Sequence, residues 1–182
     1  MSSALKWGLI TGMVYVLFSL GSNLLGLQNA GSGMMGILVN IVIMVITFFT
    51  IYMGIKEIRD EELNGEMTTG IAVKKGLQIA LFAGLLAAVF SVLYFTVIDP
   101  GFRDRMMEAN EAMFDERNVP EQSREISRSI TKVMFNPLVT FPFTIAWVVF
   151  WGLLKSLVAG SMLKTPQKPM APPMTPPSVP SV

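Results

Sequence analysis

The chain has 182 residues, of which 52% are hydrophobic and only 15% are charged, and its mean hydropathy is +0.54. Soluble domains carry about 25% charged residues, so this composition excludes an ordinary soluble domain and indicates a membrane protein. A net charge of +1 gives no whole-protein electrostatic field that would favour nucleic acid. Because the chain has no Cys and no His, we expect no metal, no haem or other cofactor and no enzymatic activity.

The distribution of charged residues divides the chain into membrane spans. No charged residue occurs between Lys6 and Lys56, a stretch too long for one helix across a hydrocarbon core of about 30 Å, which needs roughly 20 residues. Turn-forming residues at 28–33 divide this stretch in two. Of two further uncharged stretches, one ends before Pro100 and the other has Asn136-Pro137, a typical helix start, near its beginning. The predicted spans are residues 7–27, 34–55, 76–98 and 137–163.

The segment between the third and fourth spans, residues 99–132, is predicted to be an amphipathic helical hairpin. Apolar residues recur there at helical spacing in two runs. They are Phe102, Met106, Ala109 and Met113 in the first run and Ile126, Ile130 and Val133 in the second. We expect these stripes to pack on the membrane interface or the ends of the spans, with a docking surface for a partner as the alternative. The fold class expected for residues 1–164 is therefore all-α: one polytopic membrane domain of four transmembrane helices with an extracytoplasmic hairpin.

Both chain ends are predicted to lie in the cytoplasm. An even number of spans places the two termini and residues 56–75 on one side, and that side gathers basic residues close to the membrane. They are Lys6, Lys56, Arg59, Lys74, Lys75, Lys155, Lys164 and Lys168. The segment on the other side, residues 99–132, has six basic residues, but they are diluted by eight acidic ones. Residues 165–182 contain seven prolines and are expected to form a disordered cytoplasmic tail.

Three ladders of small residues at four-residue spacing predict close helix packing, because small side chains let helix backbones approach each other in lipid. The ladders are Ala4, Gly8 and Gly12; Gly76, Ala80, Gly84 and Ala88; and Gly152, Ser156 and Gly160. The second ladder is the longest, so we place its helix at a tight interface. We expect that interface within the bundle, with a contact between protomers as the alternative.

Lys155 is the one charged residue predicted at membrane depth, about two turns from the inner end of the fourth span. We expect its long side chain to snorkel to the headgroups, and a gating or lipid-phosphate contact is the alternative. Uncharged polar residues within the spans are expected to form interhelical hydrogen bonds rather than a substrate path. They are Tyr15, Ser19, Asn23, Asn40, Thr47, Thr50, Gln78, Ser91, Thr96 and Thr144.

The loop between the second and third spans is predicted to extend beyond the bilayer as a rigid helical hairpin on the cytoplasmic side. Its distinctive residues are Lys56, Arg59, Asp60, Asn64 and Gly65. Lys56 and Asp60 stand four residues apart on the outgoing helix, where opposite charges attract. Asn64-Gly65 predicts the turn, and Thr68 or Thr69 can cap the next helix.

Several weak motifs occur in an order that resembles a known family. They are Gly54-Ile55-Lys56, Arg59-Asp60, Asn64-Gly65, Gly70, Gly76, Ile98-Asp99-Pro100, Asn136-Pro137, Gly152, Ser156-Leu157 and Leu163-Lys164. Over residues 6–164 this order resembles the domain of unknown function 4199 family. The resemblance implies a small four-span protein of the bacterial inner membrane, mainly from the Bacteroidetes group, and it implies no activity. Lys155 stands where the family suggests an apolar residue, and the proline-rich tail is an addition.

The function expected first is a non-enzymatic scaffold or accessory subunit of a membrane complex, because the chain has shaped packing faces and lacks catalytic groups. The alternative is a small homo-oligomeric transporter or channel, for which Lys155 supplies the charge. A third hypothesis, an enzyme acting on lipid through Glu108 and Glu111, is disfavoured because a solvated helix face explains these carboxylates. The expected partners are the lipid bilayer and a second copy or a membrane complex. No nucleic acid and no particular small-molecule ligand are expected.

Overall fold

The computed structural model describes residues 2–25 and 34–165, and every regular element in these ranges is helical. The elements in chain order are α1 (Ser3–Leu24), α2 (Met34–Glu57), the π-helix η1 (Ile58–Glu62), α3 (Thr69–Leu93), the π-helix η2 (Tyr94–Ile98), α4 (Phe102–Glu116), α5 (Glu121–Met134) and α6 (Pro137–Leu163). Within the described ranges, 4 helices are long and apolar enough to cross a membrane. The predicted all-α class and its four spans are confirmed. The predicted turn at 28–33 and the tail beyond residue 165 lie outside the described residues.

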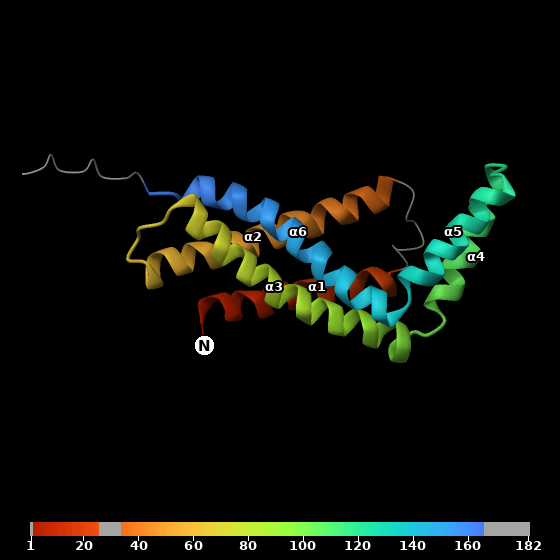
Figure 1. Ribbon diagram of the computed structural model, residues 1–182, viewed down its shortest axis with the longest axis horizontal. Coiled ribbons are helices and arrows are strands. Elements are labelled where there is room, and N and C mark those ends of the chain that lie inside the picture. The colour runs from red at the N-terminus through yellow and green to blue at the C-terminus, as the bar shows by residue number, and fades with distance from the viewer. Residues whose placement is uncertain (1, 26–33, 166–182) are drawn as a thin grey trace, which may run out of the picture.

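Helices α1, α2, α3 and α6 form an elongated bundle, and α4 and α5 extend from one end of it (Figure 1). We call this the hairpin end. The opposite end, which we call the terminal end, carries the start of α1, the turn between α2 and α3, and the end of α6 (Figure 1). The fourth span has the predicted bounds, whereas α3 begins at Thr69, seven residues before the predicted start at Gly76.

Local capping explains where the helices begin. The side chain of Thr68 accepts a hydrogen bond from the Ile71 backbone N–H at 3.3 Å, which starts α3 ahead of its two lysines. Asn136 accepts from the Leu138 N–H at 3.0 Å, and Pro137 occupies the first position of α6, where its missing N–H costs nothing. Both helices therefore start at capping residues that can be recognised in the sequence.

A zipper of small residues joins the antiparallel helices α3 and α6. The facing pairs, starting from the terminal end, are Ala72 with Gly160, Gly76 with Ser156, and Ala80 with Gly152. A Cβ atom on Gly160 would lie 2.9 Å from the Ala72 Cβ, closer than real side chains pack. The two backbones therefore approach to a separation that larger residues would prevent.

Helix α1 packs along the other side of α3. A Cβ atom on Gly12 would lie 2.9 Å from a Leu86 methyl carbon, and one on Gly8 would lie 3.0 Å from the Ile79 carbonyl oxygen. Two of the predicted ladders thus meet α3, and the third lies on α3 itself.

The bundle is packed tightly at the terminal end and loosely at the hairpin end. The core of the terminal half includes the fully buried Ile55, Ile58 and Ile79. In contrast, no described side chain of α2 from Ile37 to Ile46 is buried. Helix α2 therefore diverges from its neighbours toward the hairpin end, and this divergence creates space inside the bundle.

Charged pairs join α4 and α5 into a hairpin. The Arg128 guanidinium donates to both Glu111 carboxylate oxygens, at 2.5 and 2.7 Å, and to Glu121 at 2.7 Å. This pairing holds the pKa of the Glu111 carboxyl below its usual value and raises the pKa of Arg128. At the base of the hairpin, the Phe95 ring lies 4.9 Å from that of Phe135, centroid to centroid. The predicted helical hairpin is thus present, with its apolar Ile126, Ile130 and Val133 exposed.

Candidate functional site

Lys155 lies on α6, deep within the bundle, and only 6% of the residue is exposed. At a rise of about 1.5 Å per residue, its Cα is about 12 Å from the end of α6 at Leu163 and about 27 Å from the start at Pro137. The chain therefore places an amine at membrane depth, where an ammonium costs on the order of 3 kcal/mol even on permissive insertion scales.

Two hydroxyl groups from other helices contact the Lys155 amine. Its Nζ donates to Thr47 Oγ1 of α2 at 2.6 Å and lies 3.5 Å from the Tyr15 hydroxyl of α1. The Thr47 hydroxyl donates its own proton to the Ile43 carbonyl oxygen at 2.7 Å, so its lone pairs are free to accept from the amine. The Lys155 Nζ also lies 5.9 Å from the centre of the Tyr15 ring, a distance at which an aromatic face attracts a cation.

The expectation that Lys155 snorkels to the headgroups is wrong in this structure. The side chain points across the bundle toward α2, where it reaches Thr47. The reason is the rotation of α6, which the small-residue zipper fixes by seating Ser156 against Gly76 of α3. With Ser156 on the α3 side, the neighbouring position 155 faces the interior between α6 and α2.

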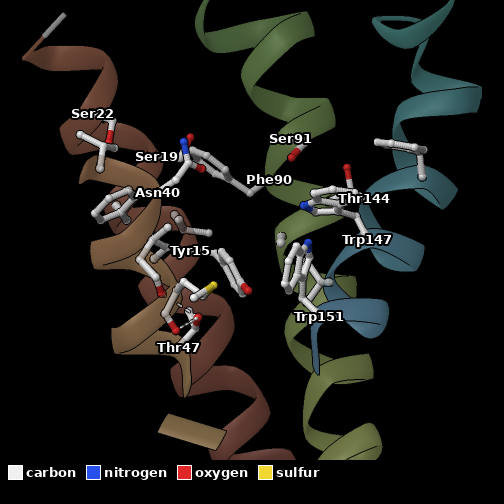
Figure 2. A pocket seen from close by; sticks show the side chains of 18 of the residues that line it. Tyr15, Ser19, Ser22, Asn40, Thr47, Phe90, Ser91, Thr144, Trp147 and Trp151 are labelled. Carbon is white, nitrogen blue, oxygen red and sulfur yellow. Dashed lines mark hydrogen bonds between the residues drawn. The ribbon is translucent and has the colours of Figure 1, made fainter. Parts of the chain in front are cut away.

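Lys155 lies at the edge of a cavity of about 1050 Å³. The cavity extends between the α1–α2 pair and the α3–α6 pair (Figure 2). Among its lining residues on α6, Lys155 is the one nearest the terminal end. Its polar lining residues are Tyr15, Ser19, Ser22, Asn40, Thr47, Ser91, Thr144 and Lys155. The size is slightly above the range of about 300–1,000 Å³ that is typical of ligand pockets. A molecule of substantial size therefore fits beside the amine.

The remaining cavity wall is apolar and rich in aromatic residues. Phe143, Trp147 and Trp151 stand four residues apart on α6 and line the cavity. The rings of Phe143 and Trp147 have centroids 6.2 Å apart, and those of Trp147 and Trp151 are 5.9 Å apart. Lys155 follows Trp151 at the same four-residue spacing. One face of α6 thus presents three aromatic rings that lead to an amine.

The cavity contains no acidic side chain among its described lining residues. No Asp or Glu in residues 2–25 and 34–165 forms a salt bridge with Lys155 either. An ammonium carries three N–H donors, and the two hydroxyl contacts leave one of them. A buried cation whose hydrogen-bond acceptors are all neutral is an uncompensated charge. The arrangement therefore favours the binding of an anion in the cavity.

The other predicted residues have different places. Six of the polar residues predicted within the spans line the cavity: Tyr15, Ser19, Asn40, Thr47, Ser91 and Thr144. Asn64 and Gly65 form the turn between α2 and α3, with φ of 51° and 84°. Asp60 pairs with the adjacent Arg59 at 2.7 Å. Lys56 lies at the end of α2.

Neither Glu108 nor Glu111 is among the residues that line the cavity. Glu111 pairs with Arg128 across the hairpin, and Glu108 lies on α4. No cluster of three or more His, Cys, Asp or Glu residues that could hold a metal ion occurs in the described part of the chain. The sequence reasoning missed the role of Phe143, Trp147 and Trp151, although their four-residue spacing with Lys155 was a usable signal.

These features define a polytopic helical membrane protein with an amine-containing cavity between its helices. The chain belongs to the family described as "Protein of unknown function (DUF4199)", which matches residues 6–165. The predicted family resemblance is thereby confirmed. No match was found among curated proteins or among solved structures.

Proposed function

We propose that the protein is a non-enzymatic membrane carrier that binds an organic anion through Lys155. The observation that supports this proposal is the Lys155 amine, which lies beside a cavity of about 1050 Å³ whose described lining has no acidic group. An anion bound there would supply the missing charge in a low-dielectric site, where electrostatic attraction is strongest. The aromatic wall would contact the apolar part of the same molecule.

The hydroxyl groups beside Lys155 suit a reversible binding site. In the structure, the amine donates to the neutral hydroxyl groups of Thr47 and Tyr15. A carboxylate or phosphate carries a negative charge opposite the ammonium, so it attracts the amine more strongly than a neutral hydroxyl does. The anion would therefore compete well for the amine and still leave, because the hydroxyl groups can take its place.

The test is a binding titration of the full-length protein in maltoside micelles with decyl phosphate as the anion. Trp147 and Trp151 line the cavity, so their fluorescence reports occupancy. Decanol and decyltrimethylammonium carry the same tail with neutral and positive heads. We expect saturable binding of decyl phosphate alone, and a Kd at least tenfold higher for Lys155→Met, which corresponds to about 1.4 kcal/mol.

The matched control is Lys164→Met, which removes the same charge from an exposed position just beyond α6. It should leave the Kd within a factor of two. Transfer of decyl phosphate to the inner leaflet of phosphatidylcholine vesicles should be faster with the protein and should return to the protein-free rate with Lys155→Met. The proposed anion site would be refuted if decyl phosphate, decanol and decyltrimethylammonium bound equally well. It would also be refuted if Lys155→Met bound decyl phosphate as tightly as the unmodified protein.

A scaffold or accessory-subunit function has one specific observation in its favour. Ile126, Ile130 and Val133 form an apolar stripe on α5, and each is more than half exposed, at 56%, 58% and 56%. Such a stripe could contact a partner protein. Purification in mild detergent distinguishes the two functions, because a scaffold requires a stoichiometric partner that Ile130→Glu releases, whereas a carrier binds decyl phosphate without one.

We also propose a bacterial inner-membrane location with the terminal end in the cytoplasm. Basic residues at that end support this orientation, because short segments rich in Lys and Arg remain in the cytoplasm. They are Lys6, Lys56, Arg59, Lys74, Lys75 and Lys164.

A further inference from the structure

We infer that the anion is the headgroup of a lipid-like amphiphile, which enters sideways from the leaflet at the hairpin end, with its head in a polar track and its tail in the gap between α2 and α6. This inference rests on the proposed function and specifies its ligand. It depends on three features of the cavity: the order of its polar residues, the openness of two of its walls, and its closed floor.

Polar side chains occur at successive depths between the hairpin end and Lys155. We measure depth along each helix axis from the hairpin end of that helix, at the usual rise per residue. Ser22 and Tyr15 then lie at depths of about 3 Å and about 14 Å on α1, and Thr47 lies at a depth of about 20 Å on α2. Ser19, Asn40, Ser91 and Thr144 line the same cavity at depths between these. Figure 2 shows their side chains around one space that leads down to Thr47. A headgroup could therefore exchange hydrogen bonds along the whole path, as burial of polar groups requires.

The walls formed by α2 and α6 are open, whereas those formed by α1 and α3 are not. Ile41 and Met44 of α2 line the cavity and are still 47% and 46% exposed, and Trp147 of α6 is 54% exposed. Lining residues of α1 and α3 such as Ser19 and Ser91 are only partly exposed. The cavity thus opens between α2 and α6, on apolar and aromatic side chains that face hydrocarbon in a membrane.

The floor of the cavity is closed. Beyond Lys155, toward the terminal end, Ile51, Ile55 and Ile79 are buried in the core. The track therefore ends near the middle of the bilayer and serves one leaflet. A water-soluble anion in this cavity would sit beside a gap filled by hydrocarbon, at a high desolvation cost. An amphiphile fills the same gap with its own tail, so its head reaches the amine without exposing charge to lipid.

The experiment uses the full-length protein in phosphatidylcholine vesicles and a decyl phosphate that carries a diazirine at the end of its chain. After illumination, labelled peptides are mapped by mass spectrometry. We expect labels on residues 37–46 of α2 and 141–151 of α6, at least fivefold above those on the lipid-facing sides of α1 and α3. Lys155→Met should reduce this labelling at least fivefold, and Lys164→Met should not change it. Labelling distributed evenly over the four spans would overturn the inference.

Competition by inorganic phosphate and methyl phosphate distinguishes an amphiphilic ligand from a water-soluble anion. An amphiphile site requires that neither displaces decyl phosphate except at concentrations at least a hundredfold higher. If either competes as well as unlabelled decyl phosphate, the ligand is a water-soluble anion, so this inference fails while the proposed function stands. If no anion binds at all, the proposed function itself fails. Thermal unfolding of each variant in maltoside excludes loss of folding as the cause.

Discussion

The residue that defines the site is Lys155. The sequence predicts its charge at membrane depth but not the direction in which its side chain points. A lone lysine in an apolar span predicts a charge at membrane depth from the sequence alone. Whether it snorkels or turns inward depends on which face of α6 meets α3, and that face is fixed by contacts such as Gly76 with Ser156. These contacts join residues 80 positions apart, so no local pattern on α6 reports them.

The hydrogen bond between Lys155 and Thr47 should stabilise the folded protein. Thr47→Val keeps the shape of the side chain but removes the oxygen that accepts from the amine at 2.6 Å. A hydrogen bond to a charged group is worth about 1.5–3 kcal/mol, so the free energy of unfolding in maltoside should fall by about that amount. In the Lys155→Met background the same change should cost much less. Additive effects in this double-mutant cycle would show that the two groups do not interact.

The zipper glycines should tolerate no side chain. Gly76→Ala places a Cβ atom against the Ser156 side chain, whereas Gly70→Ala in the same helix meets nothing within 4 Å. Overpacking costs about 1–3 kcal/mol, so Gly76→Ala should lower the midpoint of thermal unfolding by several degrees. Gly70→Ala should leave it unchanged or raise it slightly, because Ala favours helix. Equal midpoints for the two variants would contradict the close approach of α3 and α6.

At the scale of elements, the helices and their order follow from local signals, and their precise ends follow from caps. Pro137 starts α6 where the sequence predicts. Helix α3 starts seven residues before the predicted span, because charge marks the membrane boundary and Thr68 marks the helix boundary. The hairpin of α4 and α5 was also predicted from its periodicity, whereas the pairing of Arg128 with Glu111 depends on how the two helices face each other.

The hairpin should open in acid. Pairing with Arg128 lowers the pKa of Glu111, so its stabilisation is complete above the ordinary carboxyl pKa of about 4.3 and is lost as the pH falls through the lowered value. Spin labels on Ala112→Cys and Ser129→Cys report the separation of α4 and α5. Their distance distribution should be narrow at neutral pH and broad in strong acid. Glu111→Gln should give the broad distribution at neutral pH, and a narrow one would show that the ion pair does not hold the hairpin.

The whole molecule is asymmetric, with a packed terminal half and an open hairpin half. Hydropathy could not predict this difference, because both halves of each span are apolar and a lipid-facing residue resembles a core residue in composition. What separates them is the divergence of α2, on which no described residue before Thr47 is buried. The sequence therefore indicated the four spans and most polar residues of the site, and only the three-dimensional arrangement showed that these residues surround one cavity.

The proposed topology predicts opposite labelling at the two ends of the bundle. The chain has no natural cysteine, so Glu66→Cys at the terminal end and Glu116→Cys on the hairpin each give a single reactive thiol. In spheroplasts, a membrane-impermeant maleimide should label Glu116→Cys directly and Glu66→Cys only after lysis. The reverse order would place the hairpin in the cytoplasm and invert the proposed orientation.

The central claim is that the Lys155 amine contacts a bound anion, and the most direct test is a nitrogen–phosphorus distance. The protein is labelled with ¹⁵N on its lysine side chains and bound to decyl phosphate in frozen maltoside micelles, which contain no phosphorus. Dipolar recoupling between ¹⁵N and ³¹P then reports direct contact. The account predicts a strong coupling in the unmodified protein and in Lys164→Met that disappears in Lys155→Met. A coupling that is absent, or that persists in Lys155→Met, would contradict the assignment of Lys155 as the anion site.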